Sequence, residues 1–188
     1  MSLPETRPAA VNPLVVRALK IVGQGGDRRA LDIGPGDLSN TRYLLDHGVA
    51  VDVVDRNPAV VDRAAALDHS GVRAFCADIR RFPIERERYH FVVALTVPKV
   101  LRPHAISSML AAARNGLVDE GVLCCTLLGN RDSWARPGPP ATSFTRTECE
   151  RLVSDWPGVR LKEIEFDGKD RRGADKHWHW HALLLSRR

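Results

Sequence analysis

The sequence predicts an α/β protein built on a mostly parallel sheet. Short apolar runs of strand length alternate with segments whose apolar residues recur at helical spacing. The strand-length runs are almost continuously apolar, which is typical of strands covered by helices on both faces. Strands that alternate with helices indicate crossover units in a parallel sheet. The first of these runs is followed by a glycine-containing turn, Gly34-Pro35-Gly36. Because glycine has no side chain, this turn would let a ligand approach the backbone closely.

Chain length indicates the number of domains, and the cysteines indicate the redox compartment. The chain has 188 residues and a hydrophobic share of 44%, which is enough for a core without disulfides. We therefore expect residues 1–188 to form a single domain. The four cysteines form no CxxC pair, which favours a reducing compartment. Cys124 and Cys125 are adjacent in an apolar run, so we expect both to be buried on opposite sides of one strand.

Charge and hydropathy narrow the classes of partner. The net charge is +5, but both signs are spread along the chain without a long Lys/Arg run, which argues against nucleic acid. The N-terminus lacks the apolar core of a signal peptide. No apolar run approaches the roughly 18 residues that a membrane span needs. We expect a cytoplasmic monomer or homodimer that takes a small-molecule substrate.

The first two thirds of the chain predict alternating elements. Asn12-Pro13 and Asn57-Pro58 each place a capping residue before a first-turn proline, so helices are expected at 11–22 and from residue 59 to Gly71. A further helix is expected at 106–117. Strands are expected at 29–33, 50–55, 72–76, 90–96 and 121–129.

The C-terminal part predicts a helix followed by a hairpin. Residues 144–155 have helical spacing, with Thr145 or Thr147 as the cap. Residues 161–166 and 178–186 are strand-like and are joined by a charged turn, which predicts an antiparallel hairpin on the sheet. The Pro/Gly-rich segment 135–141 is expected to be a loop beside the site.

Three acids end or follow successive predicted strands. Asp32, Asp55 and Asp78 should therefore lie on one rim of the sheet, where open α/β sheets bind ligands. Asp55 comes 21 residues after Gly34, a spacing at which an acid binds ribose hydroxyls. Ser39 replaces the third glycine of the dinucleotide fingerprint, which argues against a nicotinamide cofactor. The pattern predicts a site for another nucleoside-containing ligand.

These motifs resemble those of the class I S-adenosylmethionine-dependent methyltransferases. LDIGPG resembles their first motif, VDVVDRNP the second, CADI the third and VVALTV the fourth-strand region, over about residues 28–128. FTRTECERLVSDW and the last two strands are also similar to small bacterial tellurite-resistance-type and thiopurine-type enzymes. The resemblance implies a Rossmann-like three-layer sandwich. Its seven-stranded sheet would be mostly parallel with an antiparallel last strand.

The resemblance also implies a cofactor, S-adenosylmethionine, with S-adenosylhomocysteine as the product. The residues that match the family's cofactor site are Asp32, Gly34, Pro35, Gly36, Asp55, Arg56, Asn57, Asp78, Ile79, Leu95 and Thr96. Among these, Asp32 suits the cationic amino-acid tail, and Asp55 suits the ribose. Asp78 and Ile79 would hold the adenine. Leu95 and Thr96 would lie below the sulfonium.

Several features bear on the acceptor. Leu38 stands where the family often has glycine, so its side chain must point away from the ligand or narrow the pocket. The [DN]PP[YF] tetrapeptide is absent after strand four, where the chain has LTVPKVLRP, which counts against DNA-adenine and glutamine methylation. Lys99, Arg102 and His104 either border the acceptor pocket or are solvated loop residues. Arg136 could cover an anionic acceptor. The sequence assigns no catalytic base.

A run of histidines near the C-terminus raises the question of a metal. His177, His179 and His181 alternate along one predicted strand and share a face, while Trp178 and Trp180 face the other way. Three such histidines could bind zinc, but residues two apart on a strand lie roughly 6–7 Å apart, which makes convergence awkward. We therefore favour a structural role and expect no metal. The tryptophans are expected to pack against a helix.

The sequence predicts methyl transfer from S-adenosylmethionine to a small-molecule acceptor. Two alternatives stay open. One is an RNA or protein methyltransferase, which the basic charge permits. The other is an S-adenosylmethionine-binding protein with altered catalysis.

Overall fold

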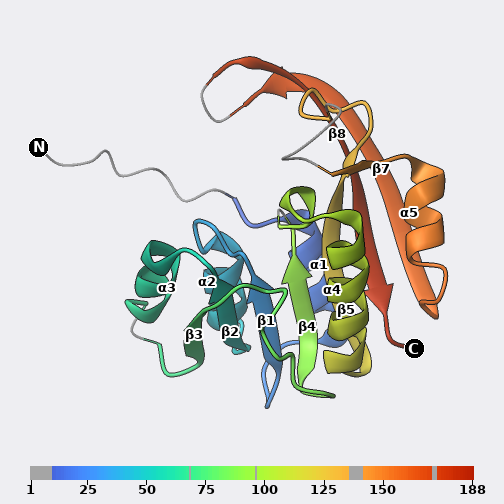
Figure 1. The fold of residues 1–188 in the computed structure, drawn as a ribbon. Coiled ribbons are helices and arrows are strands. Elements are labelled where there is room, and N and C mark those ends of the chain that lie inside the picture. The colour runs from blue at the N-terminus through green and yellow to red at the C-terminus, as the bar shows by residue number, and fades with distance from the viewer. Residues whose placement is uncertain (1–9, 68, 96, 136–141, 171–172) are drawn as a thin grey trace, which may run out of the picture.

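One twisted sheet forms the centre of the protein. The computed structural model describes residues 10–67, 69–95, 97–135, 142–170 and 173–188. Its strands are β1 (Arg29–Ile33), β2 (Ala50–Asp55), β3 (Val72–Cys76), β4 (Tyr89–Ala94), β5 (Leu117–Gly129), β6 (Ser143–Phe144), β7 (Gly158–Lys169) and β8 (Asp175–Ser186). The main path has the order β3-β2-β1-β4-β5-β8-β7, and β6 pairs with β5 off this path (Figure 1).

The sheet confirms the predicted topology. The pairs among β1 to β5 are parallel, whereas β8 is antiparallel to both β5 and β7. In this path of seven strands, β8, the last strand in sequence, is thus the antiparallel one. The seven strands of the main path fall close to where the sequence predicts them, although β5, β7 and β8 are longer than expected. The short strand β6 was not predicted.

Helices cover both faces of the sheet. They are α1 (Pro13–Val22), α2 (Ser39–Asp46), α3 (Pro58–Ala65), the 3-10 helix η1 (Pro98–Val100), α4 (Pro103–Gly116) and α5 (Arg146–Leu152). The side chains of Asn12 and Asn57 cap α1 and α3 as predicted. Thr145 caps α5 in a capping box with Glu148. Several boundaries were predicted wrongly. The helix α3 ends at Ala65, before Gly71, and Phe144 belongs to β6 instead of the helix. The helix α4 begins at Pro103 instead of Ile106, and α5 ends at Leu152 instead of Asp155.

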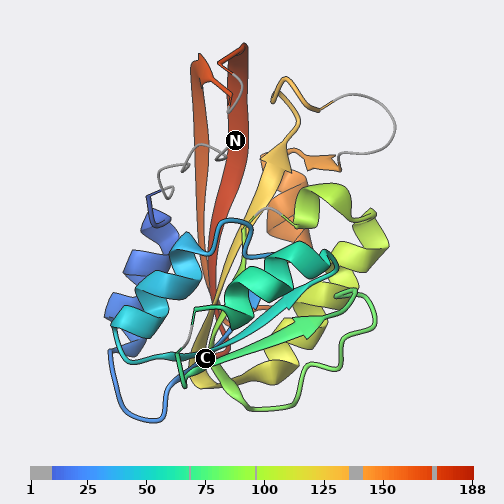
Figure 2. The same ribbon diagram turned by 90° about the vertical axis from the view of Figure 1, so that its left-hand side faces the viewer.

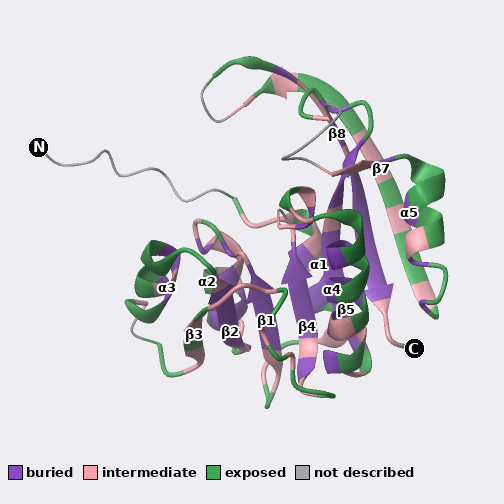
Figure 3. Cartoon of the chain, viewed as in Figure 1, coloured by how far each residue is buried: buried purple, intermediate pink, exposed green. Residues whose placement is uncertain are grey.

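Two apolar clusters fill the space between the three layers. One lies under α4 and α5 and contains Cys125. The other lies under α1, α2 and α3 and contains Cys124. Both cysteines are fully buried, so the prediction that they occupy opposite sides of one strand is confirmed. Figure 2 shows α1 and α2 on one side of the sheet and α4 on the other, and Figure 3 shows the buried central strands.

The β7–β8 hairpin extends beyond the carboxyl ends of the parallel strands. β8 pairs with β5 from Ser186 to Trp180, but its pairing with β7 continues to Asp175. The far end of the hairpin therefore curves above the edge where β1, β2 and β4 end (Figure 1). Within the part of the chain that the structure describes, no helix is long and apolar enough to cross a membrane.

Candidate active site

The glycine turn links the end of β1 to α2. Gly34 and Gly36 adopt φ values of 65° and 61°, which L side chains rarely adopt. A Cβ atom at Gly34 would overlap the Cγ2 methyl of Val97, whereas one at Gly36 would meet nothing within 4 Å. The Gly34 amide donates to the Val54 carbonyl at 2.8 Å, which fixes the turn to the end of β2. Gly36 therefore leaves open space beside a fixed backbone.

Leu38 resolves one question that the sequence left open. Its φ of 68° and ψ of 13° are left-handed, the conformation that glycine adopts most readily. Its side chain is fully buried in the cluster under α1 and α2. The side chain therefore points away from the turn and does not narrow the open space beside Gly36.

Asp32 lies beneath the turn and not on its surface. The residue is 1% exposed, and the Thr41 hydroxyl donates to its Oδ2 at 2.6 Å. Burial raises the pKa of Asp32 to about 7, the Thr41 hydrogen bond lowers it, and the negative charges of Asp37 and Asp55 add to the rise. A cation placed above the turn would favour the ionised form of this carboxyl group.

Asp55 and its neighbours lie where β2 ends. Asp55 Oδ1 accepts a hydrogen bond from the Asn57 amide at 2.8 Å, and Asn57 in turn caps α3. Arg56 is exposed between them. Arg63 was not expected in the site, yet its guanidinium donates to the Gly36 carbonyl at 2.9 Å and ties α3 to the glycine turn. Only the tertiary structure brings that arginine to the turn.

Asp78 and Ile79 follow β3 on the same rim. The Arg80 guanidinium and amide bind the Asp78 carboxylate, and these hydrogen bonds lower the pKa of Asp78 to about 2. The Asp78 carboxylate is therefore ionised at neutral pH. Ile79 is partly buried against the apolar cluster under α4 and α5. The carboxyl ends of β1, β2 and β3 thus bring Asp32, Asp55 and Asp78 to one edge, as predicted.

The region after β4 is described in part. Leu95 is partly buried against the cluster under α1 to α3. Val97 contacts Gly34 and precedes η1, which carries Lys99. Arg102 and His104 are exposed at the start of α4. Two expected positions, Thr96 and Arg136, lie outside the described residues, as do the other positions of 136–141.

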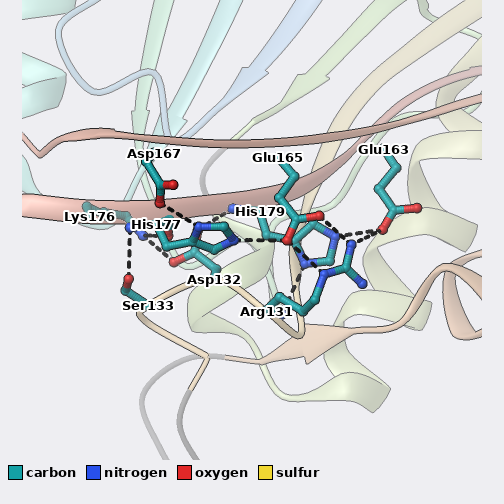
Figure 4. Close-up of polar contacts among 9 residues, drawn as sticks. All are labelled: Arg131, Asp132, Ser133, Glu163, Glu165, Asp167, Lys176, His177 and His179. Carbon is teal, nitrogen blue, oxygen red and sulfur yellow. Dashed lines mark hydrogen bonds and ion pairs between the residues drawn. The ribbon is translucent and has the colours of Figure 1, made fainter.

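The histidines of β8 face a row of acids on β7. Asp167, Glu165 and Glu163 lie opposite His177, His179 and His181 in the hairpin register. His177 Nδ1 lies 2.7 Å from Asp167, and its Nε2 lies 2.9 Å from Glu165 (Figure 4). These two carboxylates raise the pKa of His177. The face that the histidines share, as the sequence predicts, therefore packs against a row of acids, and His179 and His181 are fully buried there.

Glu163, His179 and His181 place three ligand-type atoms within 4.8 Å of one another. Hydrogen bonds nevertheless favour a structural role for this cluster. The Arg131 amide donates to His179 Nδ1 at 3.0 Å, so the ring proton lies on Nε2, which donates to Glu163 at 2.8 Å. A metal would have to displace that proton. The Arg131 guanidinium also binds Glu163, at 2.8 Å.

The prediction that Trp178 and Trp180 pack against a helix is wrong. Their ring centroids lie 5.4 Å apart, and they join an aromatic cluster with Phe166 and Trp134. Trp180 is the last residue of β8 that pairs with β5, and Trp178 lies beyond it, where β8 pairs with β7 alone. Trp134 and Phe166 expose 42% and 46% of their surface.

The part of the chain that carries this geometry matches a known protein family. A family model described as a methyltransferase domain matches residues 30–121, which contain the glycine turn, Asp55 and Asp78. Residues 30–121 thus form a methyltransferase domain of the class I S-adenosylmethionine-dependent kind. A search of curated protein sequences found no match.

Solved structures show the same fold as this chain. TehB from Haemophilus influenzae superposes with a TM-score of 0.74 at 20% identity, over 95% of this chain and 63% of that one. The chain thus spans less than two thirds of TehB. The 1,6-didemethyltoxoflavin-N1-methyltransferase of Burkholderia thailandensis gives 0.67 at 17% identity, over 95% and 78%. A methyltransferase from Methanosarcina mazei gives 0.67 at 17% identity, over 95% and 99%.

Proposed function

We propose that this methyltransferase transfers the methyl group of S-adenosylmethionine to a small-molecule acceptor. The observation that carries the proposal is the open space beside Gly36, above a fixed turn on the sheet edge where β2 ends with Asp55. Methyl transfer is an in-line displacement at an activated carbon, so the protein mainly aligns the reactants and excludes water. Glycine at positions 34 and 36 allows the cofactor to approach the backbone closely.

The proposed cofactor site keeps the roles that the motifs suggest. Asp55 accepts hydrogen bonds from the ribose hydroxyls, with Arg56 and Asn57 beside the adenosine. Asp78 and Ile79 hold the adenine, and Leu95 lies below the sulfonium. Asp32 balances the ammonium of the methionine tail from beneath the turn. Gly34, Pro35 and Gly36 line that tail.

The small-molecule acceptor is supported by the chemistry of the described edge. Asp132, an acid on the loop after β5, is fully buried and ion-paired with Lys176, which leaves it unsuited to proton abstraction. A thiolate or another soft anion needs no general base in such a displacement. The B. thailandensis enzyme carries the name of a small-molecule acceptor, which is consistent with this class.

Calorimetric titration tests the proposed function. We expect micromolar binding of S-adenosylmethionine and S-adenosylhomocysteine to the wild type, and no binding of NADH. Asp55→Ala should weaken both sulfur ligands by at least about tenfold, or 1.4 kcal/mol. Asp62→Ala removes an exposed carboxylate of α3 and should change nothing. Failure of both sulfur ligands to bind the wild type would contradict the proposal.

A further inference from the structure

A cavity opens at the edge of the sheet opposite the glycine turn. Its volume is about 740 Å³, and it lies where β4, β5 and β7 begin and β8 ends. Arg28, which precedes β1, lines this cavity, whereas Gly34 follows β1. The five residues of β1 span about 17 Å, so the cavity is separate from the proposed cofactor site. In Figure 1 this edge of the sheet lies at the bottom, on the side of the C-terminus.

One part of the cavity lining is apolar. Val22, Val122 and Leu184 line it and belong to, or pack against, the cluster under α1, α2 and α3. Ile21 and Val159 line it as well, and they expose 49% and 41% of their surface. A ligand that covers these side chains removes apolar surface from water, which favours binding. The cavity therefore suits a ligand with an apolar body.

Arg28 is placed at the cavity by the end of α1. Its Nη2 atom would lie 3.3 Å from a Cβ atom built at Gly23, the residue that caps the C-terminus of α1. The last carbonyl groups of a helix carry a partial negative charge, which attracts a guanidinium. Arg28 nevertheless forms no ion pair within the part of the chain that the structure describes. Its charge is therefore available to a ligand.

The Nε–H group of Arg28 is left without an acceptor. The Nε atom is buried, and no atom of the described residues accepts its hydrogen. A buried donor that loses water without gaining a partner destabilises the folded state, so such groups are rare in native proteins. Because Arg28 lines the cavity, an anion bound there would supply the missing acceptor.

His90 adds a second donor to the lining. Burial and the positive charge of Arg28 lower the pKa of His90, so its ring is neutral at neutral pH. The Arg29 amide donates to His90 Nδ1 at 3.3 Å, which places the ring proton on Nε2. His90 therefore offers a ligand an N–H donor and adds no charge to the cavity.

The charged residues of the lining leave one positive charge in excess. They are three arginines, Arg28, Arg160 and Arg188, and two acids, Asp119 and Glu120. Arg188 pairs with Asp119 at 3.1 Å. Arg160 is exposed and forms no ion pair with a described residue. An anion with a single charge would balance this lining, whereas a second negative charge would be repelled by Glu120.

We infer that this cavity is a ligand site of its own and that it binds a small organic monoanion, a carboxylate with an apolar body. Arg28 and Arg160 bind the carboxylate, with His90 as a further donor, and the apolar body packs on the apolar part of the lining. A guanidinium binds a carboxylate through two parallel hydrogen bonds, which uses the Nε–H group that the fold leaves unpaired. The site does not depend on the proposed function, because it lies at the opposite edge of the sheet.

A matched pair of probes tests this site. The probes are 4-phenylbutanoate and its neutral amide, 4-phenylbutanamide, each titrated into the wild type by calorimetry. We expect the carboxylate to bind about tenfold more tightly than the amide, a preference of 1.4 kcal/mol. Inorganic phosphate, which has no apolar body, should bind more weakly than the carboxylate. Equal binding of the two organic probes, no binding of either at millimolar concentration, or phosphate binding as tight as that of the carboxylate would overturn the inference.

Arginine variants assign the binding to the cavity. Arg28→Gln should remove most of the preference for the carboxylate and leave the Kd of the amide unchanged. Arg28→Lys keeps the charge but lacks the Nε–H donor, so it should retain only part of the preference. The matched control is Arg17→Gln, because Arg17 is an exposed arginine of α1 that does not line the cavity. A preference that Arg28→Gln retains, or that Arg17→Gln loses equally, contradicts the assignment.

A third variant covers the case in which Arg28→Gln does not fold, which thermal denaturation detects. Arg160→Gln changes an exposed side chain of β7 and should weaken binding of the carboxylate several-fold without affecting the amide. Unchanged binding of the carboxylate to Arg160→Gln would overturn the inference.

Two further measurements locate the bound probe. Saturation with S-adenosylhomocysteine should leave the Kd of 4-phenylbutanoate unchanged, whereas competition would place the probe at the glycine turn and overturn the inference. The Nε–H resonance of Arg28, identified by its loss in Arg28→Lys, should shift with the carboxylate and not with the amide. A resonance that saturation with the carboxylate leaves in place contradicts the site. This resonance reports on the cavity even if S-adenosylhomocysteine fails to bind, which would defeat only the proposed function.

Discussion

The glycine turn at 34–36 and the turn at 131–134 lie on the same edge of the sheet but are built in opposite ways. The glycine turn is shaped by backbone conformation, with φ values that only glycine adopts without strain. The turn at 131–134 is held by side chains distant in sequence, such as Lys176, which lies 44 residues from Asp132. The first turn leaves open space for a ligand, and the second carries charged side chains and the aromatic ring of Trp134.

This difference indicates that the two turns serve different ligands. A cofactor common to many enzymes suits a turn that depends on backbone shape alone. An acceptor that differs from enzyme to enzyme suits a surface made by side chains on a rigid support. Changes in the hairpin should therefore alter stability and acceptor choice but not cofactor affinity.

Lys176→Met should have the largest effect. It leaves the Asp132 carboxylate buried without its partner, which lowers the free energy of unfolding by about 3–5 kcal/mol. Lys169→Met breaks an ion pair whose lysine is 63% exposed and should cost less than about 1 kcal/mol. Urea denaturation measures both. Equal effects would show that the ion pair does not hold the turn in place. A loss of S-adenosylhomocysteine binding by folded Lys176→Met would contradict the view that the hairpin does not affect cofactor affinity.

Asp32→Asn should stabilise the protein without cofactor at high pH. Because the folded pKa of about 7 exceeds the ordinary value of 3.8, ionisation of Asp32 opposes folding progressively as pH rises between these values. The difference in pKa corresponds to about 4 kcal/mol at pH 8. The gain from Asn should therefore be largest at pH 8 and shrink toward pH 5. Denaturation at several pH values measures this, and a gain that does not vary with pH would contradict the assigned burial of the charge.

Gly34→Ala and Gly36→Ala form a matched pair within one turn. Both place alanine at positive φ, but only the Cβ at position 34 meets Val97. We expect Gly34→Ala to destabilise by about 2–4 kcal/mol, from strain and overpacking together. Gly36→Ala should cost about 1–2 kcal/mol in stability and act mainly on cofactor affinity. Calorimetry and denaturation separate the two, and unchanged cofactor affinity in Gly36→Ala would argue against close approach there.

Leu38→Gly should have the smallest effect on cofactor affinity. It removes a fully buried side chain but relieves a left-handed backbone, for a net loss of about 1–3 kcal/mol. Because the side chain points away from the turn, affinity for S-adenosylhomocysteine should not change. Tighter binding in Leu38→Gly would mean that the leucine narrows the site after all.

Much of the fold and of the cofactor edge could be predicted because their signals are local. Apolar runs of strand length, two Asn-Pro caps and a glycine turn each act within a few residues, and short-range geometry determines what they form. The position of Asp55 at the end of β2 follows from that order alone. The burial of Asp32 and Leu38 was harder to predict, because Asp32 is a charged residue within an apolar strand and Leu38 is an apolar residue between two polar ones.

The sequence by itself determined the parallel sheet, its helices and the rim that carries the acids. Only the tertiary structure decided that β7 places acids opposite the β8 histidines, that Asp132 pairs with Lys176, and that Arg28 and Arg160 line one cavity. Periodicity predicts which face of a strand a residue occupies. It does not tell which distant side chain meets that face, because the meeting depends on how far a hairpin extends past the sheet and where a loop crosses it.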